Sequence, residues 1–225
     1  MANNNNQQAA PQTVEQTISQ SEAFFLKYKK AIIAAVIAIV VIIAGIVLYQ
    51  TYYAGPREDK ASTILAKGQQ YFLAGDYQKA LNGDSASFKG LINVASEYSS
   101  TKAGNLANLY AGLCYAQLEK WQEAANFLEK FEGADDAMIS PAAMGALGNA
   151  YANLNQLDKA VTTLKKAAEM ADNNSLSPTF LIQAGEILES QDKKADALQL
   201  YQQVKDKYFN SMQYQTIDAY IERCK

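Results

Sequence analysis

Acidic side chains are the groups in this sequence whose type and spacing could do chemistry. Glu186 and Glu189 are three residues apart, which puts both on one face of a helix, where two carboxylates could form an acid pair or contact a metal ion. Asp135 and Asp136 fall in an expected loop, where a solvated surface explains them. No further ligand or base converges on either pair. The sequence therefore predicts no catalytic residue, no metal site and no cofactor.

Residue types that other reactions require are missing. The chain has no histidine, which removes histidine general bases and imidazole-bound zinc. Cys114 and Cys224 are far apart, and we expect packing or free thiols rather than a disulfide. The glycines are isolated and form no phosphate-binding loop. The net charge of −3 is a poor match for nucleic acid. An enzyme is thus the least favoured alternative.

Small residues recur at similar distances after Glu58 and predict the elements that carry these side chains. Gly68, Gly112, Gly148 and Gly185 are 44, 36 and 37 residues apart, and each precedes an aromatic residue or leucine by three positions. Such a pattern indicates pairs of helices that approach closely, which must stack to bury their apolar faces. An ordinary helical bundle would not repeat it. We expect hairpins at about 58–98, 102–134, 141–172 and 178–208, with a polar interruption at 82–85 in the first, and a capping helix at 211–225.

Hydroxyl residues predict where some of these helices begin. Ser140 and Ser177 each stand before a proline, the order expected when a serine caps a helix whose first turn holds the proline. Ser100 or Thr101 could cap the second hairpin in the same way. The predicted fold class is all-α throughout.

The N-terminal quarter has a different composition. Residues 1–13 are rich in Asn and Gln and are expected to be disordered. Residues 14–30 suggest a short amphipathic helix at a membrane surface, or only a polar lead-in. An uncharged run follows from Ala31 to Ala54, long enough to span a bilayer, and we place the transmembrane helix at 31–53. The long lead-in and the lack of a small-x-small cleavage site favour an uncleaved anchor over a signal peptide.

Residues beside the apolar run predict its orientation. Three lysines precede it, whereas one arginine and one lysine follow, and this modest excess favours a cytoplasmic N-terminus with residues 58–225 on the other side. Aromatic residues after the run suit the membrane interface. The expected flanking residues are Lys27, Lys29, Lys30, Tyr49, Tyr52 and Tyr53.

The glycine–tyrosine–alanine spacing resembles tetratricopeptide repeats, most clearly in Asn108–Phe131. One N-terminal span followed by such repeats also resembles the YfgM-like ancillary subunits of the SecYEG translocon. That resemblance implies a single-pass protein of the inner membrane whose periplasmic repeats contact translocon subunits, chaperones or envelope assembly factors. The Asn-rich head and the interruption at 82–85 depart from that family.

In tetratricopeptide domains the first helix of each hairpin lines a concave face, where a partner peptide can bind. Mapping that face onto this sequence gives an apolar stretch followed by amides that could bond to a peptide backbone. The alternative is that its apolar members are ordinary packing between helices. The mapped groove residues are Leu65, Gln69, Phe72, Leu73, Leu109, Leu113, Gln117, Asn149 and Asn153. Gly145, Ala152, Ile182, Glu186 and Glu189 occupy the same positions in the later repeats.

These features predict a membrane-anchored scaffold that recruits proteins to a translocon or envelope complex. A cytosol-facing receptor or assembly factor for protein targeting has the reverse topology and is the alternative. An adaptor for acidic chaperone tails is disfavoured, because Leu109, Gly145 and Ala146 stand where basic residues would be needed. Neither the oligomeric state nor the partner's identity follows from the sequence.

Overall fold

The computed structural model describes residues 14–84, 87–134 and 136–225, with side chains from Leu26 onward. The head at 1–13 and Asp135 lie outside the described residues. All regular elements in the described ranges are helices, so the expected all-α chain, with one apolar N-terminal helix before helical repeats, is confirmed. The chain divides into two compact units, one ending at Gly55 and the other running from Pro56 to Lys225.

The N-terminal unit is helical. Helix α1 spans Val14–Tyr49 and is followed by a π-helical segment, η1, over Gln50–Ala54. The large apolar side chains from Ile33 to Leu48 expose 48–64% of their surface, and none in the most apolar window is buried. Within the described ranges this is the one helix long and apolar enough to cross a membrane. A helix with apolar side chains all round needs an apolar environment on every side.

Aromatic side chains follow the apolar stretch of α1. The ring centroids of Tyr49 and Tyr53 are 5.3 Å apart, and Tyr52 exposes 77% of its surface. Before that stretch, the Lys27 ammonium lies 5.4 Å from the centroid of the Tyr28 ring. The apolar stretch therefore has side chains with a polar end and an apolar body on both sides. These are Lys27 and Tyr28 before it and three tyrosines after it.

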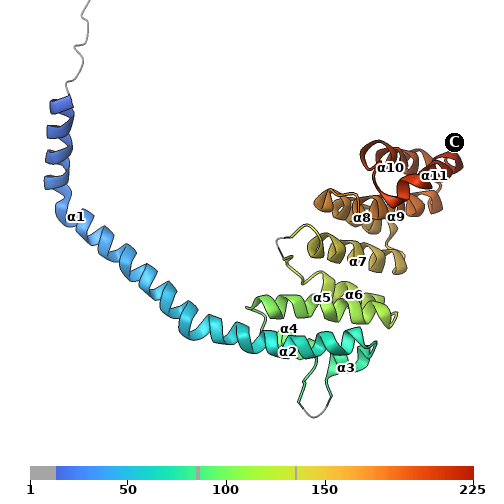
Figure 1. Cartoon of the computed structure of the whole chain (residues 1–225), viewed down its shortest axis with the longest axis horizontal. Coiled ribbons are helices and arrows are strands. Elements are labelled where there is room, and N and C mark those ends of the chain that lie inside the picture. Colours follow the sequence, from blue (N-terminus) through green and yellow to red (C-terminus); the bar gives the residue numbers. More distant parts are fainter. Residues whose placement is uncertain (1–13, 85–86, 135) are drawn as a thin grey trace, which may run out of the picture. The chain divides into compact units, whose positions relative to one another are not determined.

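The second unit is a stack of helical hairpins (Figure 1). In the first hairpin α2 (Gly55–Leu73) precedes two short helices, α3 (Tyr77–Asn82) and α4 (Leu91–Glu97). The next three pair α5 (Lys102–Gln117) with α6 (Trp121–Leu128), α7 (Ile139–Asn153) with α8 (Leu157–Ala171), and α9 (Ser177–Ser190) with α10 (Lys194–Lys207). The 3₁₀ turn η2 (Met212–Gln215) and helix α11 (Ile217–Arg223) end the stack.

Glycines allow the two helices of each hairpin to touch. A Cβ atom at Gly112 would lie 2.6 Å from Cγ of Leu128, and one at Gly148 would lie 2.7 Å from Cγ of Leu164. In each case the larger residue follows sixteen positions later. The first hairpin departs from this spacing, because Gly68 meets a leucine of α4 that follows twenty-three positions later. The difference of seven positions falls at the loop of residues 83–90, which separates α3 from α4.

Asp84 closes the base of this inserted loop. Its carboxylate accepts hydrogen bonds from the backbone N–H groups of Ser87 and Phe88, each at 2.9 Å, and from the Tyr71 hydroxyl. The Lys67 ammonium is 2.8 Å away. The bond from Lys67, followed by those from the backbone, holds the pKa of Asp84 far below its ordinary value. The insertion is therefore attached to α2.

All four turns between paired helices share one backbone motif. The chain reverses at a residue with positive φ, which is Gly75, Glu119, Asn155 or Asp192. In each turn the next residue's N–H bonds to the carbonyl five positions earlier, as Lys120 does to Tyr115 at 2.9 Å. This is the Schellman arrangement, in which glycine is preferred. Three of the four turns accept a residue with a Cβ atom.

Replacing Glu119 with glycine is expected to stabilise the repeat unit by about 0.5 kcal/mol. The left-handed conformation costs an L-residue about 1–2 kcal/mol, and glycine avoids this cost. Part of the gain is offset because glycine also gives the unfolded chain more conformational freedom. Urea unfolding measures the change. The matched control is Asn126→Gly in the middle of α6, which should destabilise the protein by a similar amount. Equal effects of the two changes would contradict the left-handed assignment.

Two of the predicted helix starts are wrong. Ser140 and Ser177 lie inside the first turns of α7 and α9, and neither is the capping residue. The Asp136 carboxylate accepts from the N–H groups of Met138 and Ser140, and the Asn173 amide oxygen accepts from that of Leu176 at 2.9 Å. An acidic or amide side chain four residues before each serine thus performs the capping. For α5 the alternative with Thr101 is confirmed, since its hydroxyl accepts from Gly104 N–H at 2.9 Å.

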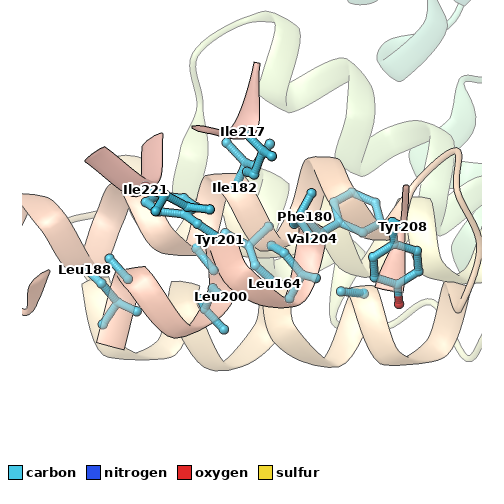
Figure 2. Packing of buried hydrophobic residues seen from close by; sticks show 14 of the residues in the cluster. Leu164, Phe180, Ile182, Leu188, Leu200, Tyr201, Val204, Tyr208, Ile217 and Ile221 are labelled. Carbon is cyan, nitrogen blue, oxygen red and sulfur yellow. The ribbon is translucent and has the colours of Figure 1, made fainter. Parts of the chain in front are cut away.

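The C-terminal end of the stack has the largest described apolar cluster (Figure 2). Leu164 from α8, Tyr201 from α10 and Ile217 from α11 each expose less than 1% of their surface there. Ile221 of α11 packs against the same cluster. Helix α11 therefore covers apolar surface that α9 and α10 would otherwise expose.

Candidate partner-binding site

An apolar cavity lies between α2, α5 and α7, the first helices of three successive hairpins. It has a volume of about 400 Å³, within the usual range of ligand pockets. Gln69 and Phe72 line it from α2, Leu109 and Leu113 from α5, and Ile139 from α7. Helices α2 and α5 each supply residues three or four positions apart, so one stripe of each helix faces the cavity. The side-chain amide of Gln69 provides a polar group in this wall.

Aromatic contacts fix one wall of this cavity. The Phe72 ring meets the Tyr110 ring edge-on, with centroids 5.5 Å apart, and it also meets the Tyr77 ring at 5.8 Å. Phe72 is thus held between α3 and α5 instead of folding into the open space. Leu109 is 7% exposed and belongs to the wall, whereas Phe72 and Leu113 are partly exposed. A partner side chain entering the cavity would meet Phe72 and Leu113.

The structure brings four of the nine mapped groove residues together and leaves five outside. Leu65 is 5% exposed and packs in the core of the first hairpin, whereas Leu73 is 82% exposed. Gln117 and Asn153 are exposed, and the Asn153 amide donates to the Asn149 carbonyl oxygen at 2.9 Å. None of the five lines the cavity. The amide-lined continuation expected from the sequence is therefore not part of it.

Two further positions mapped to the concave face pack between repeats. Gly145 is buried, and a Cβ atom there would lie 2.2 Å from the ring of Phe180 on α9. Ile182 is 8% exposed and belongs to the C-terminal cluster. At these positions the packing alternative holds, because the third and fourth hairpins touch where the groove was expected.

Sequence reasoning missed several cavity residues. Leu106 and Tyr110 precede the mapped leucines of α5 by three positions each, so a wider stripe would have included them. Ile139 and Ala142 come from the first turn of α7, where the spacing of small residues gave no sign of a cavity. Ala143 completes the missed set.

A larger cavity of about 640 Å³ lies between α4, α5 and α6, and some of its polar side chains already have hydrogen-bond partners within the protein. The Asn105 amide donates to the Gly133 carbonyl oxygen at 2.8 Å and accepts from the backbone N–H of Glu132 at 2.9 Å. The Tyr151 hydroxyl donates to the Glu129 carboxylate. Asn105 holds the loop after α6 to α5, and Glu129 joins the second hairpin to the third, so the apolar cavity is the better candidate.

The acidic pair on α9 does not act as a pair. Glu189 accepts hydrogen bonds from the Tyr201 hydroxyl and from the Arg223 guanidinium, the latter at 2.8 Å, whereas Glu186 is exposed. Burial alone would raise the pKa of Glu189, but the bonds from Tyr201 and Arg223 outweigh it and hold the pKa below its ordinary value of 4.5. Glu189 thus links α9 to α10 and α11.

Replacing Glu189 with glutamine is expected to destabilise the repeat unit at about pH 7, and the difference from wild type should shrink below about pH 4.5. A carboxylate whose pKa is depressed in the folded state contributes stability above its unfolded pKa and loses it as the pH falls through the folded value. Urea unfolding at both pH values measures the difference. Glu186→Gln is the matched control and should match wild type at both. An equal loss for Glu189→Gln at both pH values would contradict the charged role.

The two cysteines are buried packing residues. Cys114 is 0% exposed, and burial raises the pKa of its thiol to about 12. Cys224 is 8% exposed, and burial, followed by the charge of Glu189, also raises its pKa. Both thiols are protonated at neutral pH and would react slowly. Among the residues with described side chains, no three or more acidic or cysteine residues are grouped to hold a metal ion.

Comparison with known proteins assigns the family. No curated protein matches this chain. A family model described as a tetratricopeptide repeat-like domain matches residues 22–220, which is most of the chain. Domains of this kind commonly mediate interactions between proteins and are typically not catalytic. The chain belongs to the tetratricopeptide repeat-like family.

Proposed function

We propose that this protein is a membrane-anchored scaffold whose repeat domain recruits other proteins to a translocon or envelope complex. Helix α1 crosses the inner, cytoplasmic membrane with its N-terminus in the cytoplasm, and the repeats stand on the periplasmic side. The observation that carries the proposal is an unburied apolar helix placed directly before a tetratricopeptide repeat-like domain, a kind of domain that commonly mediates protein interactions. Holding a binding domain at a membrane raises the local concentration of its partners there.

The anchor is supported by exposure. Burial inside the protein would explain an apolar core helix, yet the residues of the most apolar window of α1 are 0% buried. Exposed side chains from Ile33 to Leu48 would cause aggregation in water, whereas a bilayer covers them. The excess of lysine before the span supports the cytoplasmic N-terminus.

The recruiting surface is the apolar cavity between α2, α5 and α7. Phe72 and Leu113 are available to an apolar side chain of a partner segment, and the Gln69 amide can bond to its backbone. Translocon subunits, chaperones and envelope assembly factors are the proposed partners, by the resemblance to YfgM-like proteins. The alternative, a cytosol-facing receptor for protein targeting, shares the cavity and differs in topology.

Labelling of an introduced cysteine separates these two topologies. Thr162 is exposed on α8, whereas both native thiols are buried, so wild type provides the unlabelled background. In right-side-out membrane vesicles, a membrane-impermeant maleimide is expected to label Thr162→Cys without lysis. Labelling only after lysis would establish the cytosol-facing alternative. Release of the full chain from membranes by alkaline carbonate would contradict an integral anchor.

A further inference from the structure

One edge of the repeat domain is joined from end to end by hydrogen bonds between loops. We call it the entry edge, because the chain enters the domain there at Pro56. It consists of the first turns of α2, α5, α7 and α9 and the ends of α4, α6, α8 and α10, with the loops that join them. At its beginning, the Glu58 carboxylate accepts from the backbone N–H groups of Lys102 at 2.7 Å and Ala103 at 2.9 Å. This carboxylate caps α5 from α2.

Further bonds continue along the entry edge. The Asn105 amide, in the first turn of α5, reaches the loop after α6, as described above. In the loop after α8, the Asn173 amide donates to the Ala137 carbonyl oxygen of the previous loop at 3.4 Å. The Gln213 amide of η2 donates to the Thr179 hydroxyl in the first turn of α9 at 2.9 Å. The entry edge is therefore one connected surface from Glu58 to η2.

Exposed apolar side chains of the repeat domain gather on this edge. Among the described residues from Pro56 onward, seven large apolar residues are exposed, and six of them lie on the entry edge. Only Leu73 lies at the opposite edge, where α2 ends. Single exposed apolar residues are ordinary, but a one-sided distribution marks a surface that contacts something apolar. The six are Met138 (52% exposed), Ile139 (45%), Met170 (41%), Phe209 (61%), Met212 (86%) and Tyr214 (41%).

The covalent chain keeps the first residue of this edge, Pro56, close to the membrane. The proposed transmembrane helix ends at Tyr53 and the domain begins three residues later, a distance of at most about 10 Å even for extended chain. We propose that the entry edge lies on the lipid interface of the membrane that the anchor crosses, with Phe209 and Met212 inserted among the headgroups and upper acyl chains. This inference rests on the proposed anchoring.

Charge pairing indicates what kind of lipid contact this is. Lys205 is 2.6 Å from Asp218 and Lys207 is 2.6 Å from Asp172, so the two lysines at the end of α10, just before Phe209 in the sequence, already have acidic partners. The contact is therefore driven by apolar burial and needs no anionic lipid. It should persist in zwitterionic vesicles and at high salt, where attraction between surface charges is screened.

A tethered edge would also orient the partner site. Ile139 belongs both to the entry edge and to the wall of the apolar cavity. An entry edge resting on lipid would hold that cavity beside the membrane surface, where the segments of membrane proteins that emerge from the bilayer would reach it.

Quenching of tryptophan by brominated lipid tests this inference on the full-length protein in phosphatidylcholine vesicles. The sole tryptophan is removed by Trp121→Phe, and single tryptophans are introduced by Phe209→Trp on the entry edge, Leu73→Trp on the opposite edge and Val40→Trp in the anchor. Circular dichroism and thermal unfolding confirm that each variant is folded. Brominated acyl chains are expected to remove about half of the fluorescence of Phe209→Trp and less than about a tenth of that of Leu73→Trp.

The anchor variant separates the two ways in which the inference could fail. Strong quenching of Val40→Trp, with Phe209→Trp quenched no more than Leu73→Trp, would overturn the membrane-resting edge and leave the anchor standing. A lack of quenching in Val40→Trp would contradict the anchor itself. Quenching of Phe209→Trp that disappears at high salt would also overturn the proposal, because it would show a contact held by charge.

Discussion

The Leu164→Ala variant is expected to lose about 3–5 kcal/mol of unfolding free energy, which is the upper part of the range for removing a buried leucine. Leu164 is 0% exposed and lies where two packing surfaces meet. One side of it fills the space left by Gly148 on α7, and the other belongs to the cluster with Phe180 and Tyr201 (Figure 2). The cavity would be enclosed by backbone and by other repeats, so little collapse can offset it. Urea unfolding measures the loss.

A double-mutant cycle tests whether Leu164 acts through Gly148. A Cβ atom at Gly148 would lie 2.7 Å from Cγ of Leu164, so Gly148→Ala alone should cost about 1–3 kcal/mol by overpacking. In the Leu164→Ala background that clash is gone, and Gly148→Ala should be nearly neutral. Additive losses, or a loss below about 1 kcal/mol for Leu164→Ala, would contradict the close approach of α7 and α8.

Gly104→Ala is the second change with a large expected effect, a loss of about 3 kcal/mol or more. A Cβ atom at Gly104 would lie 1.9 Å from the carbonyl oxygen of Tyr98. Backbone cannot rotate away as a side chain can, so the turn between α4 and α5 would have to move. That movement would also disturb the bond from Gly104 N–H to the Thr101 hydroxyl.

The control for Gly104→Ala is Lys102→Ala in the same turn, where the side chain is exposed. It should change the unfolding free energy by no more than about 0.5 kcal/mol. Thermal and urea unfolding of both variants measure the difference. A Gly104→Ala protein as stable as Lys102→Ala would show that α4 and α5 do not approach as closely as the structure has them.

The repeat pattern could be predicted because it follows from a steric requirement. A glycine facing a large residue sixteen positions later recurs in three hairpins, and sequence spacing reports it directly. In the fourth hairpin Tyr201 takes the place of leucine, with its ring 2.4 Å from a Cβ at Gly185 and its hydroxyl on Glu189. Because the Tyr201 hydroxyl bonds to the Glu189 carboxylate, Glu189 has a structural role and is not part of an acid pair with Glu186.

Helix starts were harder to predict, because capping depends on which side chain reaches the free N–H groups. Asp136 and Asn173 cap α7 and α9 from the preceding loops, and the serine–proline pairs gave no sign of this. Glu58 contributes to the cap of α5 from forty-four residues earlier. A bond between residues so far apart follows from tertiary packing and not from local sequence.

The cavity was predicted in part, because its outline depends on how neighbouring helices pack. Gln69, Phe72, Leu109 and Leu113 lie within it as the concave-face mapping suggested, but α7 contributes its first turn. Asn149 and Asn153 follow Ile139 by ten and fourteen residues, which is about 15–20 Å along the helix. The amides are therefore too far along α7 to line the space that α2 and α5 enclose.

Photocrosslinking in the native membrane tests most directly whether this cavity of an anchored scaffold holds a partner. A photoreactive residue replaces Leu113 in the full-length chain, and the control position is Thr162, which is exposed on α8. We predict a discrete protein adduct from position 113 that is absent from position 162 and is lost when Ile139→Glu places a charge in the cavity wall. The same adducts from both positions, or none from position 113 in a folded and membrane-bound protein, would contradict the proposed partner site.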